Sequence, residues 1–509
     1  MAFAYFLGAS GLMDGWVIAF MLPNLARRLF GEGAAAAALI PVYCEQAHQD
    51  RPKAVELART VFTAILVLLV LIVLAGEAVI WTSYRFFSVH EAARLKLSLA
   101  AVMLPYMIMV CLVAIVVGIL HCHRRFATGA AAPVVLNVFI ITALCASGWL
   151  MDVEPGKQVF IVAAAVLAAG LAQLALQVPS LRASGLSIRP AWAVRTESFK
   201  KVAALMAPMI VGLTATQINT MADHFTALWL SGSAEKGSFL TILGTAVRYP
   251  MWEGSVSQLF YSQRLYQFPL GVMGISLATV IFPVMSADAA RKDLDGFRRT
   301  VSRGLRLAVS IAVPAAAGLF LVRRPLVAVI FERGQFSARD TALTAGILAF
   351  YCLGLCGFFL QQIAARAFFS MQDSKTPTAS ALAAVGTNII LNLTLVWFLA
   401  ARGLALATAA CSYLQVVILL VVLNRRFGRS ILSRLAATAA RTLMATFLFY
   451  LVGAGILDLL GGMPACFSSD IIRLAVVIPI CTATFLAAAW LLRIEVFALI
   501  TGYGKAETV

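Results

Sequence analysis

Long apolar runs alternate with short polar segments along the whole chain. A run of about 20 apolar residues is long enough to cross a bilayer as an α-helix. We therefore predict thirteen spanning helices and, at the start of the chain, the end of one more. The predicted spans lie near residues 10–45 (one broken helix), 60–81, 97–120, 127–151, 158–181, 202–230, 259–287, 304–331, 341–370, 377–400, 403–424, 437–459 and 471–492.

The chain also repeats itself. Ile40-Pro41-Val42 is followed by Ala58-Arg59-Thr60-Val61, and Phe282-Pro283-Val284 is followed by the similar Arg298-Arg299-Thr300-Val301. The helix with Leu136-Asn137 likewise matches the helix with Leu391-Asn392, and both matches are offset by about 240–255 residues. Two halves in parallel register are a common transporter plan, with the site between the halves.

The predicted fold is therefore an all-α polytopic membrane protein with two six-helix lobes in parallel repeat plus two extra C-terminal helices. We place the N-terminal lobe, with its first helix truncated, at residues 1–181. The C-terminal lobe follows at 182–424, and the extra helix pair with a cytoplasmic tail occupies 425–509.

Composition supports a membrane protein and changes the interpretation of the charge. The 509 residues are 61% hydrophobic and only 12% charged, whereas soluble domains average about 25% charged. The net charge is +17, which in a soluble protein would suggest nucleic acid. Here most basic residues fall in short loops, so topology and lipid headgroups explain them better, and we expect no nucleic-acid partner.

The basic residues also predict an orientation. One alternate set of predicted loops holds 22 Lys and Arg residues and the other set holds 11. Because cytoplasmic loops are enriched in Lys and Arg, the loop at 46–59 and the C-terminus are predicted to be cytoplasmic. We expect a multi-pass membrane protein.

The nine cysteines do not predict a disulfide framework. Six of them lie in apolar runs, where cysteine packs as a small hydrophobe. His121-Cys122-His123 has the composition of a metal site, but no second ligand group is nearby in the sequence, so a solvated loop is the favoured interpretation.

Ionisable residues interrupt the first predicted span. Asp14, Arg27, Arg28 and Glu32 lie among residues that otherwise belong in lipid. Such groups are costly at membrane depth unless they face a polar cavity or a partner. Pro23 and the nearby glycines break the helix, and broken backbone is tolerated beside protein or water. This segment is predicted to line a wet, cationic cavity for an anionic substrate.

Arg264 is the corresponding charge in the second half. It lies in a helix that Pro269 bends, among Gln263, Tyr266 and Gln267. We expect it to face Arg27 across a cavity. The alternative is that its long side chain reaches out to the membrane interface.

Polar oxygens form a third group at membrane depth. Asp223 lies in the span 202–230, Asn388 and Asn392 are one turn apart on one helix face, and Thr408 is on the next helix. A carboxylate, two amides and a hydroxyl suit Na⁺ or a proton relay. The equally weighted alternative is interhelical hydrogen bonding.

These segments together resemble the MurJ/MviN lipid II flippases of the multidrug/oligosaccharidyl-lipid/polysaccharide exporter superfamily. The strings run in family order and are specific only as a set. They are Pro23-Asn24-Leu25-x-Arg27-Arg28-Leu29-Phe30-x-Glu32-Gly33-Ala34, Pro105-Tyr106, Arg125-Phe126 with Ala132-Pro133-x-x-Leu136-Asn137, Gln217-Ile218-Asn219-x-x-x-Asp223, Arg264-Leu265-x-x-Phe268-Pro269-x-Gly271-Val272, and Phe369-Ser370-x-Gln372-Asp373-x-Lys375-Thr376-Pro377.

The resemblance implies fourteen helices, a central cationic cavity and a lipid-tail groove beside the last two helices. It implies transport of undecaprenyl-pyrophosphate-linked disaccharide-pentapeptide to the outer face for peptidoglycan synthesis. Asp14, Arg27, Glu32 and Arg264 match family positions linked to transport.

Two features depart from the family pattern. Family members begin with about two dozen further residues, including a Ser-Arg…Gly-Phe-x-Arg-Asp type motif with two functional arginines, which this sequence lacks. A translation start placed too late, a fragment, or an inactive member would each explain this, and we expect the first. The polar insert around 232–258 is also longer than usual.

The number and position of acidic residues distinguish the competing functions. A drug exporter of the same superfamily would more often carry acidic cavity residues than two arginines. A polyprenyl-phosphate glycosyltransferase would need paired acids or a catalytic His on an exposed loop, whereas the predicted outer loops hold only isolated acids, such as Asp152, Glu154 and Glu253.

We therefore predict a lipid II flippase rather than an enzyme, working by alternating access, with no cofactor and with Na⁺ or H⁺ as the candidate coupling ion. A cation-coupled exporter of another polyprenyl-linked saccharide or drug, or an inactive scaffold relative, is the alternative. Membrane lipids and peptidoglycan synthases of the cell-wall machinery are the candidate partners.

Overall fold

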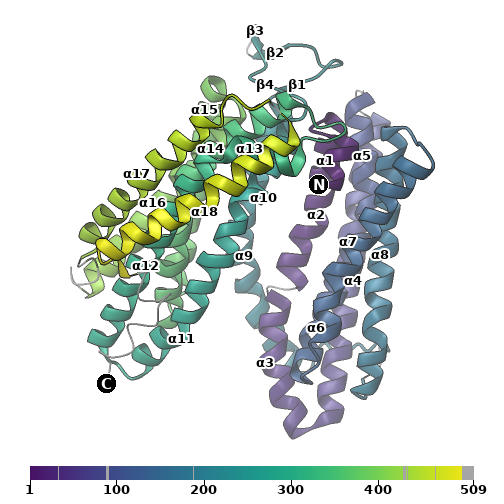
Figure 1. Ribbon diagram of the computed structural model, residues 1–509. Coiled ribbons are helices and arrows are strands. Elements are labelled where there is room, and N and C mark those ends of the chain that lie inside the picture. The colour runs from purple at the N-terminus through teal and green to yellow at the C-terminus, as the bar shows by residue number, and fades with distance from the viewer. Residues whose placement is uncertain are drawn as a thin grey trace. The chain divides into compact units, whose positions relative to one another are not determined.

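A computed structural model of the chain describes residues 1–31, 34–86, 91–186, 189–242, 244–427, 432, 434–464 and 466–495 (Figure 1). The side chains of 31, 34–37, 91, 92, 207, 208, 210–216 and 242 also lie outside the described part. Two compact units divide the chain. The N-terminal unit comprises Ala2–His224 and Ser231–Gly254, and the C-terminal unit comprises Met1, Phe225–Leu230 and Ser255–Val509.

The N-terminal unit is built around α6. This helix packs against α3, α4 and α8, and Cys111, Ile115 and Leu120 on it are completely buried. α4 instead exposes Leu71, Leu74, Val79 and other large apolar side chains, as expected for a face in lipid. The elements are α1 (Ala2–Leu7), α2 (Gly11–Ala26), the π-helix η1 (Arg27–Gly31), α3 (Ala34–Gln49), α4 (Arg51–Phe86), α5 (Glu91–Met103), α6 (Tyr106–Cys122), α7 (Ala127–Cys145), the π-helix η2 (Ala146–Leu150), α8 (Pro155–Ala183) and α9 (Glu197–Trp229), whose last residues belong to the other unit.

The C-terminal unit has α14 at its centre. This helix packs against α10, α11, α12, α13 and α16, and its Tyr351, Leu355 and Phe368 are completely buried. α17 and α18 lie beside one another and against α12 (Figure 1). The elements are α10 (Ser255–Pro269), the π-helix η3 (Leu270–Ile275), α11 (Ser276–Ala290), α12 (Leu294–Leu321), α13 (Arg323–Phe331), α14 (Ala338–Ser370), α15 (Lys375–Leu399), α16 (Ala401–Phe427), α17 (Leu435–Leu459) and α18 (Phe467–Leu491).

The two units repeat one plan. The N-terminal unit opens with α2, the π-segment η1 and α3, and the C-terminal unit opens with α10, the π-segment η3 and α11. Pro41 within α3 and Pro283 within α11 take the same place in the two series. Each series is followed by a long helix, α4 or α12. The order of elements therefore agrees with the parallel repeat that the sequence predicts.

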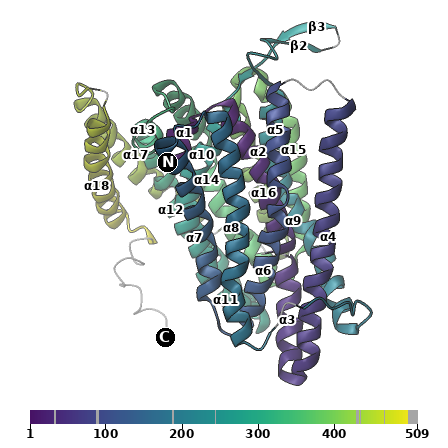
Figure 2. The ribbon, with the colours of Figure 1, turned by 90° about the vertical axis from the view of Figure 1, so that its right-hand side faces the viewer.

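The polar insert between α9 and α10 contains all four strands of the described chain. β1 (Ser231–Gly232) and β4 (Met251–Trp252) pair in parallel, in the register Ser231↔Met251. β2 (Phe239–Ile242) and β3 (Thr245–Arg248) form an antiparallel hairpin, in the register Phe239↔Arg248. The hairpin projects beyond the α1 and α5 end of its own unit in both views (Figures 1 and 2). The all-α prediction missed these strands because each of them is only two to four residues long.

The spanning helices follow the prediction closely. Eleven helices in the described part are long and apolar enough to cross a membrane. The other two predicted spans correspond to α2–η1–α3 and to α9. The predicted span 304–331 is divided, because α12 ends at Leu321 and α13 begins at Arg323. The predicted three-part division at 181/182 and 424/425 stays a prediction, beside the two units described above.

Candidate functional site

The helix break at Arg27 begins with a proline. Pro23 is buried within α2, and because proline has no N–H it removes one hydrogen bond of the helical ladder. The backbone continues through the π-segment Arg27–Gly31. π-Segments inside α-helices are frequently found at functional sites. The predicted interruption of the first span is confirmed, with a π-turn as its form.

The two arginines of this break lie in different surroundings. The Arg27 side chain is half-buried, whereas Arg28 is exposed. Arg28 Nη1 donates a hydrogen bond of 2.8 Å to Gln217 Oε1 on α9. The structure thus joins Arg28 to Gln217, a pairing that the sequence did not indicate. Glu32 lies outside the described residues.

Asp14 contacts the insert. Its side chain is 1% exposed, and Oδ2 accepts a hydrogen bond of 2.7 Å from the backbone N–H of Gly254. Gly254 has φ +93, and an added Cβ would overlap the carbonyl oxygen of Ala9. The carboxylate also lies in the first turn of α2, where the helix dipole favours negative charge. Asp14 therefore fastens the end of the insert to α2, and its predicted role in substrate binding stays a prediction.

Arg264 lies on an exposed face of α10. Its Nη1 donates to Gln267 Oε1 at 3.3 Å, and its guanidinium lies 4.6 Å from the centroid of the Phe260 ring. The predicted cluster around Arg264 is split. Gln263 is buried and donates to the Tyr351 hydroxyl at 3.0 Å. Tyr266 stacks on Phe358 and packs against Tyr351 with the two rings tilted.

The helix of Arg264 repeats the arrangement at Arg27. Pro269 ends α10, and the π-segment η3 follows directly. Each unit therefore presents at least one predicted site arginine close to a proline and a π-segment. That Arg27 and Arg264 face each other across a cavity stays a prediction, because the two side chains belong to different units.

Three of the four predicted cation ligands meet between α15 and α16. Asn392 Nδ2 donates to Asn388 Oδ1 at 2.9 Å, and Asn388 Nδ2 donates to Thr408 Oγ1 at 3.3 Å. All three side chains are buried. The chain of bonds ties the two helices together, as in the alternative interpretation. Asp223 is also buried but belongs to the N-terminal unit.

A clamp that sequence reasoning missed joins the turn before α15 to the end of α16. Asp373 accepts hydrogen bonds from the Thr376 backbone at 3.0 Å and hydroxyl at 2.8 Å, and it pairs with Arg426 at 2.7 Å. Burial raises the pKa of the Asp373 carboxyl, but the bonds from Thr376 and Arg426 outweigh burial and hold that pKa below its usual value. Asp373 belongs to one of the sequence strings that carry the family resemblance. That string was the only signal in the sequence that could have indicated a role for Asp373.

A disulfide was missed as well. Cys44 on α3 and Cys122 on α6 are bonded, with their Cα atoms 6.0 Å apart. Beside it, the Tyr43 hydroxyl and His123 Nε2 are hydrogen-bonded at 2.8 Å. The tripeptide His121-Cys122-His123 therefore holds helices α3 and α6 together rather than forming the solvated loop that was favoured.

The chain contains two similar series of helices, and in each an arginine lies in or near the π-segment that follows the first helix. This arrangement defines a polytopic α-helical membrane transporter built from two repeats. The chain belongs to the lipid II flippase MurJ family, whose model matches residues 3–467. This membership confirms the predicted family and the prediction of a transporter rather than an enzyme. It also places the protein in the bacterial inner membrane, in agreement with the membrane-length helices.

Individual relatives agree with this assignment. A probable lipid II flippase MurJ of Vibrio cholerae is 32% identical over 429 residues, which cover 82% of this chain and 77% of the relative. A probable lipid II flippase MurJ of Rhizobium meliloti is 32% identical over 460 residues, covering 88% and 81%. The lipid II flippase MurJ of Burkholderia cenocepacia is 29% identical over 433 residues, covering 82% and 78%.

Solved structures agree in fold. A lipid II flippase MurJ in an inward closed conformation is 22% identical with a TM-score of 0.76, covering 97% of this chain and 95% of that one. An inward-facing multidrug resistance MATE family transporter of the MOP superfamily is 14% identical with a TM-score of 0.59, covering 86% and 95%. At these identities the likeness concerns the fold alone.

Proposed function

We propose that the protein moves lipid II, the polyprenyl-pyrophosphate-linked disaccharide-pentapeptide, from the cytoplasmic to the outer face of the inner membrane. The observation that carries the proposal is the arginine beside a π-helical break in each repeat, Arg27 in the first and Arg264 in the second, in a chain of the lipid II flippase MurJ family.

The chemistry of the two arginines fits a pyrophosphate. A guanidinium keeps its charge and donates in a planar fork that matches phosphate oxygens. Arg264 is exposed and Arg27 is half-buried. Alternating access would carry the headgroup past the membrane midplane while the polyprenyl tail stays in lipid.

Complementation of a flippase-depleted strain tests the proposal. We expect Arg27→Ala and Arg264→Ala each to abolish growth while the protein remains in the membrane at the level of the parent. Lysine at either position should restore little, because it loses the bidentate geometry. Arg195→Ala, at an exposed loop arginine of the N-terminal unit, is the matched control and should complement fully. Full growth of both site variants would contradict the proposal.

We further propose that a monovalent cation, Na⁺ or H⁺, couples the return of the empty carrier to the membrane potential through Asp223, with Asn388, Asn392 and Thr408 as candidate ligands. Buried oxygen groups at membrane depth support this proposal. One charge moving through about 100 mV provides about 2.3 kcal/mol, enough to bias a two-state carrier roughly 50-fold.

Asp223→Asn separates coupling from structure. Under the coupling proposal the variant folds, binds the headgroup normally and moves lipid II without dependence on Na⁺ or pH. A variant that keeps the ion dependence of the parent would rule out Asp223 as the coupling group.

Orientation and partners complete the proposal. The excess of basic residues in one set of loops supports a cytoplasmic C-terminus. Since peptidoglycan synthases consume the transported precursor, we propose that they act beside this protein. Cross-linking in intact cells would test their proximity.

A further inference from the structure

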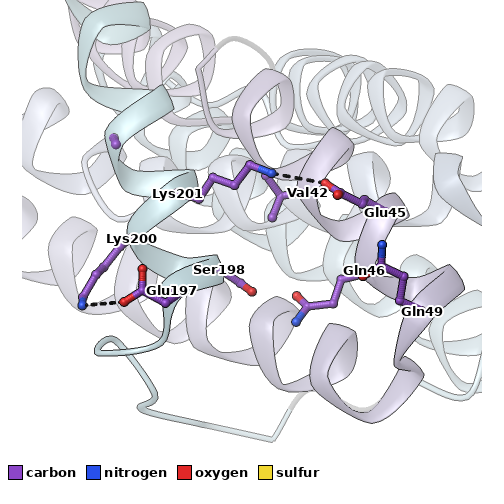
Figure 3. Close-up of a pocket in the computed structure, with 9 residues that line it drawn as sticks. Val42, Glu45, Gln46, Gln49, Glu197, Ser198, Lys200 and Lys201 are labelled. Atoms are coloured by element: carbon purple, nitrogen blue, oxygen red, sulfur yellow. Dashed lines mark hydrogen bonds and ion pairs between the residues drawn. The ribbon is translucent and has the colours of Figure 1, made fainter.

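A polar cavity of about 570 Å³ lies in the N-terminal unit between the end of α3 and the beginning of α9 (Figure 3). Pockets of roughly 300–1,000 Å³ are typical of sites for small organic ligands. The cavity is apart from the residues assigned above to the pyrophosphate and the cation. Its lining residues are Val42, Glu45, Gln46, Gln49, Glu197, Ser198, Lys200, Lys201 and Ala204.

Charges of both signs line this cavity. Lys201 on α9 pairs with Glu45 on α3 at 3.2 Å and so bridges the two walls. Lys200 pairs with Glu197 on α9 itself at 3.0 Å. The Lys201 and Glu45 side chains remain 58% and 57% exposed, and ion pairs as exposed as this contribute little stability. Both pairs can therefore exchange partners with a ligand that brings a carboxylate and an ammonium group.

Uncharged groups of the cavity also offer hydrogen bonds. Gln46 Oε1 is buried and has no hydrogen-bond partner within the described part of the chain. The Gln46 amide and the Ser198 hydroxyl point toward each other across the gap between the helices (Figure 3). A buried acceptor without a partner is costly, so a ligand N–H group between these two side chains would satisfy it.

We propose that this cavity binds the peptide stem of the lipid-linked substrate. The proposal rests on the proposed function and names the part of the substrate that the cavity recognises. The pyrophosphate carries only negative charge and would be repelled by Glu45 and Glu197. The disaccharide presents mainly neutral hydroxyl groups. The peptide combines carboxylates for the lysines, N–H groups for Gln46 and, in stems with a diamino acid, an amine for the glutamates.

The position along the chain suits this division of the substrate. The cavity lies at the end of α3, and α3 is the next element of the chain after the η1 segment that holds Arg27. On the orientation proposed above, the ends of α3 and the beginning of α9 are cytoplasmic, on the side from which the substrate enters. The same helical series would thus hold the pyrophosphate at its break and the peptide at its cytoplasmic end.

Two lipids and three variants of the full chain test the proposal. The probes are lipid II and the same undecaprenyl-pyrophosphate-disaccharide without its peptide. Binding of each is measured to the purified protein in nanodiscs. Lys201→Met removes one cation of the cavity, and Gln46→Met removes the amide at similar volume. Lys53→Met is the matched control, since Lys53 also forms an exposed ion pair, with Asp50 at 2.9 Å, outside the cavity.

We expect Lys201→Met and Gln46→Met each to weaken binding of lipid II about tenfold, which corresponds to about 1.4 kcal/mol. Binding of the lipid without peptide should equal that of the parent, and Lys53→Met should match the parent for both lipids. Equal losses for the two lipids would show that the cavity residues only hold α3 to α9, and unchanged binding of lipid II would show that the peptide lies elsewhere. Either result overturns the peptide site alone, whereas a parent protein that binds neither lipid overturns the proposed function itself.

Discussion

At the scale of single residues, the contacts of Gly254 hold the end of the insert between α9 and α10 against α2. Gly254 combines a positive φ, a backbone N–H that reaches Asp14 and a close approach to Ala9. No side chain other than hydrogen fits all three conditions, because a Cβ would overlap the Ala9 carbonyl oxygen. Glycine is therefore required at position 254 both by the backbone conformation and by the contact with Ala9.

Gly254→Ala should lower the thermal midpoint of the purified protein clearly. We expect a cost of about 2–4 kcal/mol, because backbone strain at a positive φ adds to the steric overlap. Gly237→Ala is the matched control. Gly237 also has a positive φ, +76, but an added Cβ there meets nothing within 4 Å, so only the conformational cost of about 1 kcal/mol remains. Equal midpoints for the two variants would contradict the described contact with Ala9.

Asp14 can be tested for two roles at once. Asp14→Asn keeps an oxygen that accepts the Gly254 N–H and removes the charge, whereas Asp14→Ala removes both. If the contact with the insert is the main role, Asn should retain nearly the stability and transport of the parent. Ala should cost about 1–3 kcal/mol, the penalty of leaving a buried donor without its partner. If a stable Asn variant lost transport, the negative charge of Asp14 would instead be required for transport of the substrate.

At the scale of elements, side chains at helix ends join segments that the chain keeps apart. The clamp of Asp373, Thr376 and Arg426 joins the turn before α15 to the end of α16. The Asn388–Asn392–Thr408 chain joins the same two helices within the unit. α15 and α16 are therefore held by polar contacts both at one end and along their length.

Asp373→Asn should weaken this clamp at neutral pH. The Asp373 side chain is 17% and Arg426 44% exposed, so we expect a loss of about 1 kcal/mol after allowing for solvent screening. Because the folded pKa of Asp373 lies below its unfolded value, the stabilisation is present above the unfolded pKa of about 3.9 and is lost as the pH falls through the folded pKa. Thermal midpoints of parent and variant should therefore differ at pH 7 and converge only as the pH falls below the folded pKa of Asp373. A difference that persists unchanged at low pH would show that the charge of Asp373 does not matter.

The elements themselves could be predicted from the sequence, and most of these contacts could not. Apolar length sets the spanning helices, and Pro23 with the charges after it indicates the break in α2. The partner of a buried polar group is a different matter. Arg28 meets Gln217, and Asp14 meets Gly254, over long separations in the chain. Periodicity carries no information on such pairs, and a backbone N–H donor such as that of Gly254 has no sequence signature at all.

At the scale of the whole molecule, the orientation in the membrane determines which loops meet which compartment. Among the cysteines outside the disulfide, all of which lie in the described part, Cys466 alone is exposed. Hydrogen bonds from Ser468 and Ser469 lower the pKa of its thiol to about 7. It caps the beginning of α18, after the turn that follows α17. With a cytoplasmic C-terminus this turn is external.

A membrane-impermeant maleimide should therefore label Cys466 in intact spheroplasts without permeabilisation. The rate should rise with pH around a midpoint near 7, because the thiolate is the reactive form. Ser468→Ala with Ser469→Ala should move that midpoint toward the ordinary thiol value of about 8.5. Cys466→Ser is the control and should abolish external labelling. Labelling that appears only after permeabilisation would reverse the proposed orientation.

The contact between Asp14 and Gly254 also has a consequence for how the protein is made. Gly254 is the last residue of the N-terminal unit, and the helices from α10 onward belong to the other unit. Domains fold from the N-terminus onward during synthesis. The ribosome therefore delivers every residue of the first repeat, including the insert that fastens onto α2, before the first helix of the second repeat emerges. We expect the first repeat to complete its own packing, including the contact of Gly254 with Asp14, while the second repeat is still being translated.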